Sequence, residues 1–183
     1  MPKIDQALVL CAIALAGCAD SGDRAAQAPP PKPELFEPGP KFRPAPVSEA
    51  VKRARPIHGL RCKRREQERY LAHLETFVDG RVVLMPAGIG VRGRCSYPLR
   101  TREPTGLIEV ERGLRPTLAD LFHVWGQPLS RRRVLSFEGP VRAYVGSRPA
   151  AGDPRRIRLW PHAVVTLETG RYVRPHAHYV FPP

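Results

Sequence analysis

The sequence predicts an α+β domain with a small, β-grasp-like mixed sheet and one main helix. Three observations support this: an opening hairpin around Asp79-Gly80, one amphipathic stretch over residues 118–125, and three short β-type stretches after it. A hairpin, a helix and closing strands, in that order, favour a helix packed across a mixed sheet. The alternative is a β-sandwich in which the helix is only a connection.

The opening hairpin spans residues 71–85. Residues 71–78 alternate apolar and polar side chains, Asp79-Gly80 is a two-residue turn signal, and residues 81–85 form the returning strand. The segment Pro86-Ala87-Gly88-Ile89-Gly90 ends this pairing, and residues 106–111 form the next predicted strand.

A single convincing helix follows. Thr117 is a plausible N-cap, Gly126 ends the helix, and the apolar side chains between them form one stripe. That stripe consists of Leu118, Leu121, Phe122 and Trp125. Three further strands are predicted at residues 141–145, 156–160 and 164–168.

The first seventeen residues have the pattern of a secretion signal. Their apolar run, residues 7–15, is too short to span a bilayer as a helix. It ends in Leu15-Ala16-Gly17-Cys18, which resembles the lipobox of bacterial lipoproteins, where the cysteine thiol takes a diacylglycerol before cleavage. We therefore expect a lipidated Cys18 that holds the protein in a lipid bilayer. Ala19 resembles the sorting pattern for the outer membrane, so we expect a periplasm-facing envelope lipoprotein there.

The mature chain divides into a tether and a domain. Residues 18–56 comprise the predicted lipidated Cys18 and a proline-rich stretch with little apolar content, which predicts a disordered tether. Residues 57–183 have the length of one ordinary globular domain with a single core.

The formal net charge is +13, and most of the basic residues are arginines spread along the chain. Secretion argues against nucleic acid as a partner, so none is expected. The arginine runs, including Arg131-Arg132-Arg133, are typical of solvated faces in a protein from a GC-rich genome. The alternative is attraction to anionic lipid or an acidic cell-wall polymer, weakened by salt. An envelope protein is a further candidate partner.

Two cysteines remain in the predicted domain, Cys62 and Cys95. An oxidising envelope favours a disulfide between them, which would stabilise the fold by about 3 to 4 kcal/mol in the chain-entropy model. No Cys-x-x-Cys redox motif is present. A role for either thiolate as a metal ligand stays open.

Several distinctive segments occur together in the domain: Gly59-Leu60-Arg61-Cys62, Phe77-Val78-Asp79-Gly80, Pro86-Ala87-Gly88-Ile89-Gly90, Cys95-Ser96-Tyr97-Pro98-Leu99, Thr105-Gly106-Leu107-Ile108, Val124-Trp125-Gly126-Gln127-Pro128-Leu129 and His178-Tyr179-Val180-Phe181-Pro182. Together they resemble a family of uncharacterised bacterial secreted and lipoprotein domains. The resemblance covers essentially the whole domain and implies no settled function.

Members of that family have alternating histidines on the first strand, a Leu-His-Thr-His-Asp segment after the second cysteine, and a histidine on the next strand. Such imidazoles suit a transition-metal site. In this chain only one first-strand histidine, His73, is present, next to Arg69 and Leu71. The later segment is Leu99-Arg100-Thr101-Arg102-Glu103, and Glu109 takes the last histidine position.

Guanidinium groups offer no lone pair and repel a cation, so the resemblance implies that this member has lost most of the metal site. The residues Arg69, Arg100, Arg102, Glu103 and Glu109 are instead expected to form a salt-bridged cluster. The alternative is an anion pocket built from the same residues.

A residual site for Cu or Zn is the alternative chemistry. His176 and His178 have the spacing that places both rings on one strand face, and His73 would supply a third nitrogen. This would make the chain a periplasmic metal-binding or trafficking protein. No Gly-x-Ser-x-Gly, glycine-rich phosphate loop or His-Glu-x-x-His occurs, so we expect no catalytic residues and no resident cofactor. The sequence favours a non-catalytic binding domain tethered to the envelope.

Overall fold

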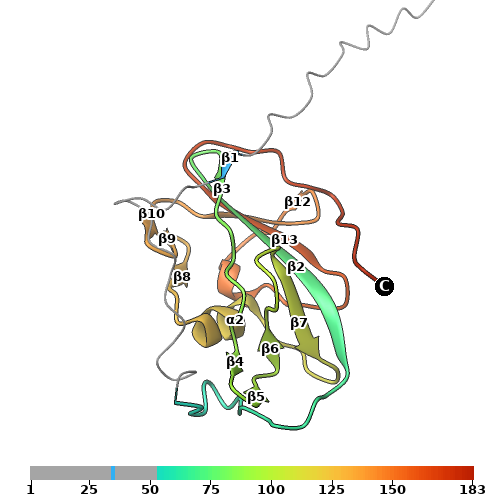
Figure 1. The fold of residues 1–183 in the computed structure, drawn as a ribbon. Helices are drawn as coiled ribbons and strands as arrows, with labels where there is room; N and C mark the ends of the chain where they lie inside the picture. The colour runs from blue at the N-terminus through green and yellow to red at the C-terminus, as the bar shows by residue number, and fades with distance from the viewer. Residues whose placement is uncertain (1–33, 36–52) are drawn as a thin grey trace, which may run out of the picture. The chain divides into compact units, whose positions relative to one another are not determined.

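A computed structural model describes residues 34–35 and 53–183 (Figure 1). The predicted signal segment, Cys18 and the predicted tether up to residue 52 lie outside the described residues, apart from Glu34–Leu35. Within the described part of the chain, no helix is long and apolar enough to cross a membrane.

The main sheet has eight strands. They are β1 (Glu34–Leu35), β2 (Arg69–Val78), β3 (Arg81–Val82), β6 (Leu99–Arg100), β7 (Leu107–Glu111), β11 (Arg142–Val145), β12 (Arg148–Pro149) and β13 (Val164–Thr169). The long strand β2 pairs in parallel with β13 on one side. On its other side it pairs antiparallel with β7 along its first half and with β3 at its last two residues. Strand β6 extends the sheet beyond β7, and β1 runs parallel to β3.

The strand order β7-β2-β13-β11-β12 is that of a β-grasp sheet. The first and last long strands, β2 and β13, are its parallel central pair, and the helix α2 (Leu118–Trp125) lies in the connection between β7 and β11. The predicted α+β fold with a mixed sheet and one main helix is therefore confirmed. The alternative of a β-sandwich is not what the described residues form, because α2 packs against the sheet in one hydrophobic core.

The helix has the predicted bounds because both of its ends are set locally. The backbone N–H of Thr117 donates a hydrogen bond to the carboxylate of Asp120 at 2.8 Å, which closes a capping box. Gly126 ends the helix in the left-handed conformation, with a φ of 78°. The side chains that face the sheet are Leu118, Leu121, Phe122, Val124 and Trp125, all buried.

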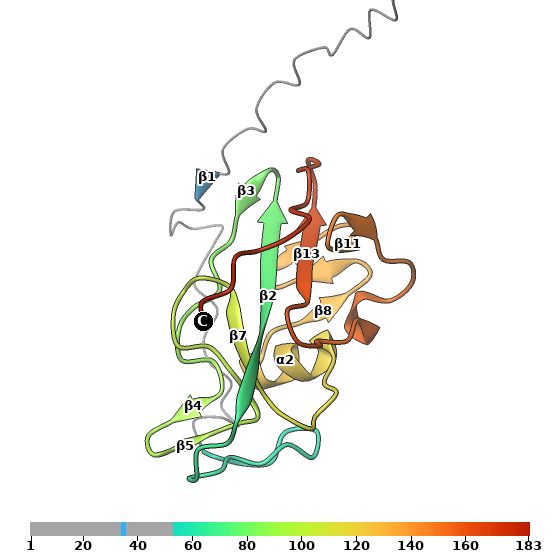
Figure 2. The same ribbon diagram turned by 90° about the vertical axis from the view of Figure 1, so that its right-hand side faces the viewer.

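The two faces of the sheet are covered differently. On one face, Ala72 and Leu74 of β2 join the core beneath α2. Because strand residues alternate, His73 and Glu75 lie on the other face. That face is crossed by the C-terminal segment (Figure 2). The Tyr179 ring of this segment stacks on His73, with the ring centroids 3.8 Å apart.

The hairpin turn at Asp79-Gly80 forms as predicted, with a φ of 49° at Asp79 and 82° at Gly80. The returning strand β3 ends at Val82 instead of continuing to residue 85. The predicted strand at residues 156–160 is wrong. Asp153 caps a short 3-10 helix, η1 (Pro154–Arg156), and after it only one isolated bridge joins Arg158 to Thr117.

Two small sheets lie outside the main one, and the sequence did not predict them. One consists of β8 (Leu129–Ser130), β9 (Arg133–Val134) and β10 (Phe137–Glu138); the other consists of β4 (Val91–Arg92) and β5 (Cys95–Ser96). The predicted disulfide is present and joins Cys62 to Cys95, with the Cα atoms 5.5 Å apart. This bridge ties the segment before β2 to β5, and neither sulfur remains available as a thiolate ligand.

Candidate functional site

The predicted arginine–glutamate cluster lies where β6, β7 and the start of β2 meet. Arg100 and Glu109 are register partners on neighbouring strands, and Arg100 Nε donates to Glu109 Oε2 at 2.6 Å. Arg100 is only 5% exposed and also donates to Ser96 Oγ at 3.0 Å and to both carboxylate oxygens of Glu66. Every nitrogen of this buried guanidinium therefore has an oxygen partner.

The other two arginines of the cluster share the same carboxylates. Arg102 Nε lies 2.8 Å from Glu109 Oε1, and Arg69 Nε lies 3.4 Å from Glu66 Oε1 and 3.9 Å from Glu109 Oε2. The terminal nitrogens of Arg69 donate to two backbone carbonyls and to Ser96 Oγ. Glu103 is exposed and takes no part in these ion pairs, although it lines the adjoining hollow. Glu66, which the sequence analysis did not single out, pairs with the arginines in the role that was expected of Glu103.

The pKa shifts in the cluster follow from burial and from these ion pairs. Burial lowers the pKa of Arg100, but its hydrogen bonds to Glu66 and Glu109 outweigh burial and the net shift is upward. The hydrogen bond from Arg100 holds the pKa of Glu66 below its usual value. Burial, and then repulsion from Arg100, lower the pKa of Arg69. A cluster with its own carboxylates has little free charge for an outside anion, so the geometry favours the salt-bridge interpretation over the anion pocket.

The three candidate metal-binding histidines do not converge. The buried His73 has its Nε2 3.1 Å from the carbonyl oxygen of Thr105, and burial lowers its pKa. His176 Nδ1 lies 2.9 Å from the Glu75 carboxylate, and His178 is exposed. No group of three histidine, cysteine, aspartate or glutamate side chains in the described ranges is placed to hold a metal ion. His73 and His176 each contact a different partner, and the expected three-nitrogen arrangement is not among the side-chain groups of the described residues that could hold a metal.

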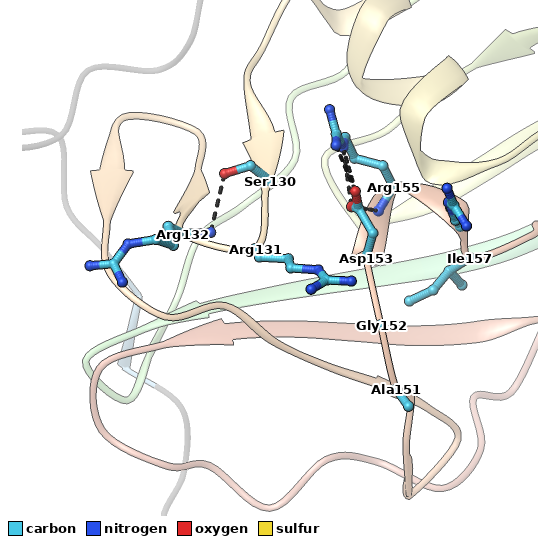
Figure 3. A pocket seen from close by; sticks show the side chains of 9 residues that line it. Ser130, Arg131, Arg132, Ala151, Gly152, Asp153, Arg155 and Ile157 are labelled. Atoms are coloured by element: carbon cyan, nitrogen blue, oxygen red, sulfur yellow. Dashed lines mark hydrogen bonds and ion pairs between the residues drawn. The ribbon is translucent and has the colours of Figure 1, made fainter.

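A separate concavity has four arginines in its lining (Figure 3). It has a volume of about 640 Å³ and lies between the β8–β9 turn and the segment around η1. Its lining is formed by Ser130, Arg131, Arg132, Ala151, Gly152, Asp153, Arg155, Arg156 and Ile157. We call it the arginine hollow. Its lining contains four arginines and one carboxylate, so it carries an excess of positive charge.

Asp153 organises one side of the arginine hollow. Its Oδ1 accepts a hydrogen bond from the backbone N–H of Arg155 at 3.0 Å, which caps η1. Both carboxylate oxygens also accept from the Arg155 side chain, at 2.6–3.1 Å. This pairing lowers the pKa of Asp153 to about 2, and the positive charge of Arg131 contributes. Asp153 is therefore ionised at neutral pH and fixes Arg155 in place.

The remaining arginines of the hollow are not neutralised. Arg131 extends towards Asp153, whereas the guanidinium of Arg132 points to the opposite side (Figure 3). No ion pair of Arg131, Arg132 or Arg156 occurs within the ranges that the structure describes. Arginine side chains without carboxylate partners, set around a concavity, form a surface that attracts anions.

The arginine hollow has only a weak signal in the sequence. Arg131-Arg132 belongs to a run typical of solvated faces, Arg156 begins the predicted strand at residues 156–160, and Arg155 precedes that strand. Each pair is adjacent to a turn, where side chains are free to project. No local sequence pattern indicates that Arg131-Arg132 and Arg155-Arg156 line the same concavity, because the two segments are far apart in the chain.

No family model, curated protein sequence or solved structure matches this chain. The resemblance to a histidine-bearing family of secreted domains therefore stays a prediction. The functional argument rests on the geometry and charge of the sites described above.

Proposed function

We propose that this chain is a lipoprotein of the bacterial cell envelope, anchored through Cys18, whose domain binds phosphate-bearing envelope material without catalysing a reaction. The observation that supports the binding function is the arginine hollow, whose lining contains four arginines and one aspartate. The anchor and the location rest on the lipobox-like segment before Cys18.

The contrast with the salt-bridged cluster supports the choice of site. Arg69, Arg100 and Arg102 each pair with Glu66 or Glu109, and the pairing compensates the two buried guanidinium groups, Arg69 and Arg100. In the arginine hollow Asp153 compensates Arg155, and the other three arginines have no ion pair within the described residues. Uncompensated arginines repel one another, so a site that retains them is better suited to a charged ligand than to stabilising the fold.

Phosphate is the anion that fits this lining best. A guanidinium group presents paired N–H donors that match two phosphate oxygens, and hydrogen bonds between ionised groups are stronger than neutral ones. The hollow is an open concavity, so a phosphate on a lipid headgroup or along a polymer can enter without a conformational change. Binding is expected to weaken as salt increases, because exposed charges are screened.

The test uses the mature chain with Cys18→Ser, which removes acylation and leaves the domain intact. Calorimetric titration with a short linear polyphosphate is compared for the parent, Arg131→Gln/Arg156→Gln, and a control pair, Arg92→Gln/Arg94→Gln. The control removes the same charge from the exposed β4–β5 hairpin. We expect the hollow variant to lose about tenfold or more in affinity, since hydrogen bonds to charged groups contribute about 1.5–3 kcal/mol each. Equal losses in the two variants would show that only net charge matters and would refute the site.

A second arm identifies the source of the phosphate. Vesicles of neutral phospholipid with and without an anionic phospholipid are sedimented with the same three proteins. Retention that depends on Arg131 and Arg156 identifies a headgroup, whereas binding of polyphosphate without vesicle retention identifies a polymer. The anchor is tested separately in cells, where incorporation of labelled fatty acid should be lost in Cys18→Ser; persistence of the label would refute lipidation at that residue.

A further inference from the structure

A second concavity, distinct from the arginine hollow, contains an exposed tryptophan. It has a volume of about 550 Å³, and its lining consists of Tyr70, Arg112, Gly113, Leu114, Arg115, Arg158, Leu159, Trp160 and Pro161. We call it the Trp160 groove. Trp160 is 47% exposed, whereas Trp125, the other tryptophan, is 2% exposed in the core. An exposed indole ring in a concavity offers a large aromatic surface to a ligand.

The groove is held in shape by backbone contacts between its two walls. The N–H of Leu159 donates to the carbonyl of Pro116 at 2.9 Å, and the N–H of Leu118 donates to the carbonyl of Ile157 at 2.8 Å. The hydroxyl of Tyr70 donates to the carbonyl of Leu159 at 2.7 Å. These bonds fix the loop after β7 against the segment that carries Trp160, so the groove exists before a ligand arrives and little ordering is needed on binding.

Positive charge surrounds the tryptophan. Three arginines line the groove, and no carboxylate is part of its lining. Arg112 has only a loose, exposed pairing with Glu68 at 3.7 Å. Arg115 and Arg158 form no ion pair within the described part of the chain, and no ring there stacks on Trp160. The aromatic face and two of the guanidinium groups are therefore available to a ligand.

We propose that the Trp160 groove binds an acidic saccharide. One face of a sugar ring presents C–H groups that pack against an aromatic ring, which accounts for Trp160. Carboxylate or phosphate substituents on the sugar pair with Arg115 and Arg158, which accounts for the charge. A bare phosphate has no apolar face that could pack on Trp160, and a neutral sugar has no anionic group that could pair with the arginines. The combination selects a ligand with an apolar ring face and anionic substituents.

The two tryptophans provide a direct assay. Acrylamide quenches an exposed indole and reaches the buried Trp125 poorly, so quenching of the mature Cys18→Ser protein reports mainly on Trp160. We expect a tetrameric oligogalacturonate to protect Trp160 from acrylamide. Neither a neutral tetrasaccharide of glucose nor a linear tetraphosphate should protect it. Absence of protection by oligogalacturonate, or equal protection by tetraphosphate, would overturn the proposal.

Calorimetric titration with the same oligogalacturonate assigns the residues. Trp160→Ala and Arg115→Gln/Arg158→Gln should each weaken binding about tenfold or more, while Trp160→Phe, which keeps an aromatic face, should retain most of it. The Arg92→Gln/Arg94→Gln control should bind like the parent; unchanged affinity in Trp160→Ala would refute the stacking role. The Arg131→Gln/Arg156→Gln variant should still bind oligogalacturonate, so failure of the arginine hollow and failure of the Trp160 groove give different results.

Discussion

Replacing Glu109 by Gln should destabilise the domain strongly, because one carboxylate serves three arginines. Its oxygens lie 2.6 Å from Arg100 Nε and 2.8 Å from Arg102 Nε, with Arg69 Nε at 3.9 Å. The side chain of Arg100 is only 6% exposed, so water cannot replace the lost carboxylate there. Glu66 remains, but its side chain is 62% exposed and holds its charge mainly in solvent.

The expected cost is about 3 kcal/mol, which is the lower end of the range for removing one partner of a buried ion pair. The lower end applies because Glu66 still compensates part of the charge. For a domain of this size such a loss lowers the melting temperature by about 10 °C. Urea unfolding of the oxidised protein should show a lower midpoint with an unchanged slope, since the surface exposed on unfolding is the same.

The matched control is Glu138→Gln, which removes a carboxylate from an exposed pair. Glu138 lies 3.8 Å from Arg133, and both side chains are largely in solvent. Its loss should cost less than about 0.5 kcal/mol. If Glu109→Gln is no more destabilising than Glu138→Gln, then Arg100 is adequately solvated and the salt-bridge interpretation is refuted. Replacing Arg100 and Glu109 together by leucine should recover stability relative to Glu109→Gln, because no buried charge is then left unpaired.

Three further predictions concern the disulfide, a tight turn and acid stability. Replacing Cys62 and Cys95 by Ser should lower the free energy of unfolding in urea by about 3 to 4 kcal/mol. A variant with the same urea midpoint as the oxidised parent would contradict this. Gly90→Ala should prevent folding or cost several kcal/mol by circular dichroism, because its φ is +70° and a Cβ would lie 2.1 Å from the carbonyl oxygen of Leu99. The lowered pKa of Glu66 contributes stability above its unfolded value near 4.5, and this contribution is lost as pH falls through the lower folded value. As pH falls below 4.5, the melting temperature of Glu66→Gln should therefore decrease less steeply than that of the parent. The same pH dependence in both proteins would contradict a contribution of Glu66 to stability.

Local signals explain which parts of the fold could be predicted. The helix was placed correctly because Thr117 and Gly126 set its ends through contacts within a few residues. The same holds for the turn at Asp79-Gly80, whose backbone conformation suits few other residue types. The segment at 156–160 was misassigned because Asp153 and Pro154 start a 3-10 turn, and this local chemistry overrides the alternating pattern that follows. Strands of two residues contain no periodic signal at all.

The salt-bridged cluster was predictable in part, because strand neighbours share a face. Arg100 and Glu109 are cross-strand partners, and Arg69 lies on the adjoining strand. Glu66 was missed because it precedes β2, where no pattern fixes its direction. Glu103 was chosen in its place, but it lies beyond the end of β6 and its side chain is free to point into solvent. Sequence alternation therefore predicts which face a side chain occupies inside a strand, but it does not predict this beyond the strand ends.

The distribution of charge argues against genome composition as the whole explanation of the arginines. Charged side chains that are buried in the sheet have partners of opposite charge: Arg69 and Arg100 share Glu66 and Glu109, and the fully buried Glu168 pairs with Arg142 at 3.1 Å. Neutralisation is required there, since an unpaired buried charge would cost several kcal/mol. Much of the surplus behind the net charge of +13 consequently lies in loops. Two of those loop regions are concave and lined by arginines with few or no carboxylates, which is the arrangement that concentrates positive potential on an anionic ligand.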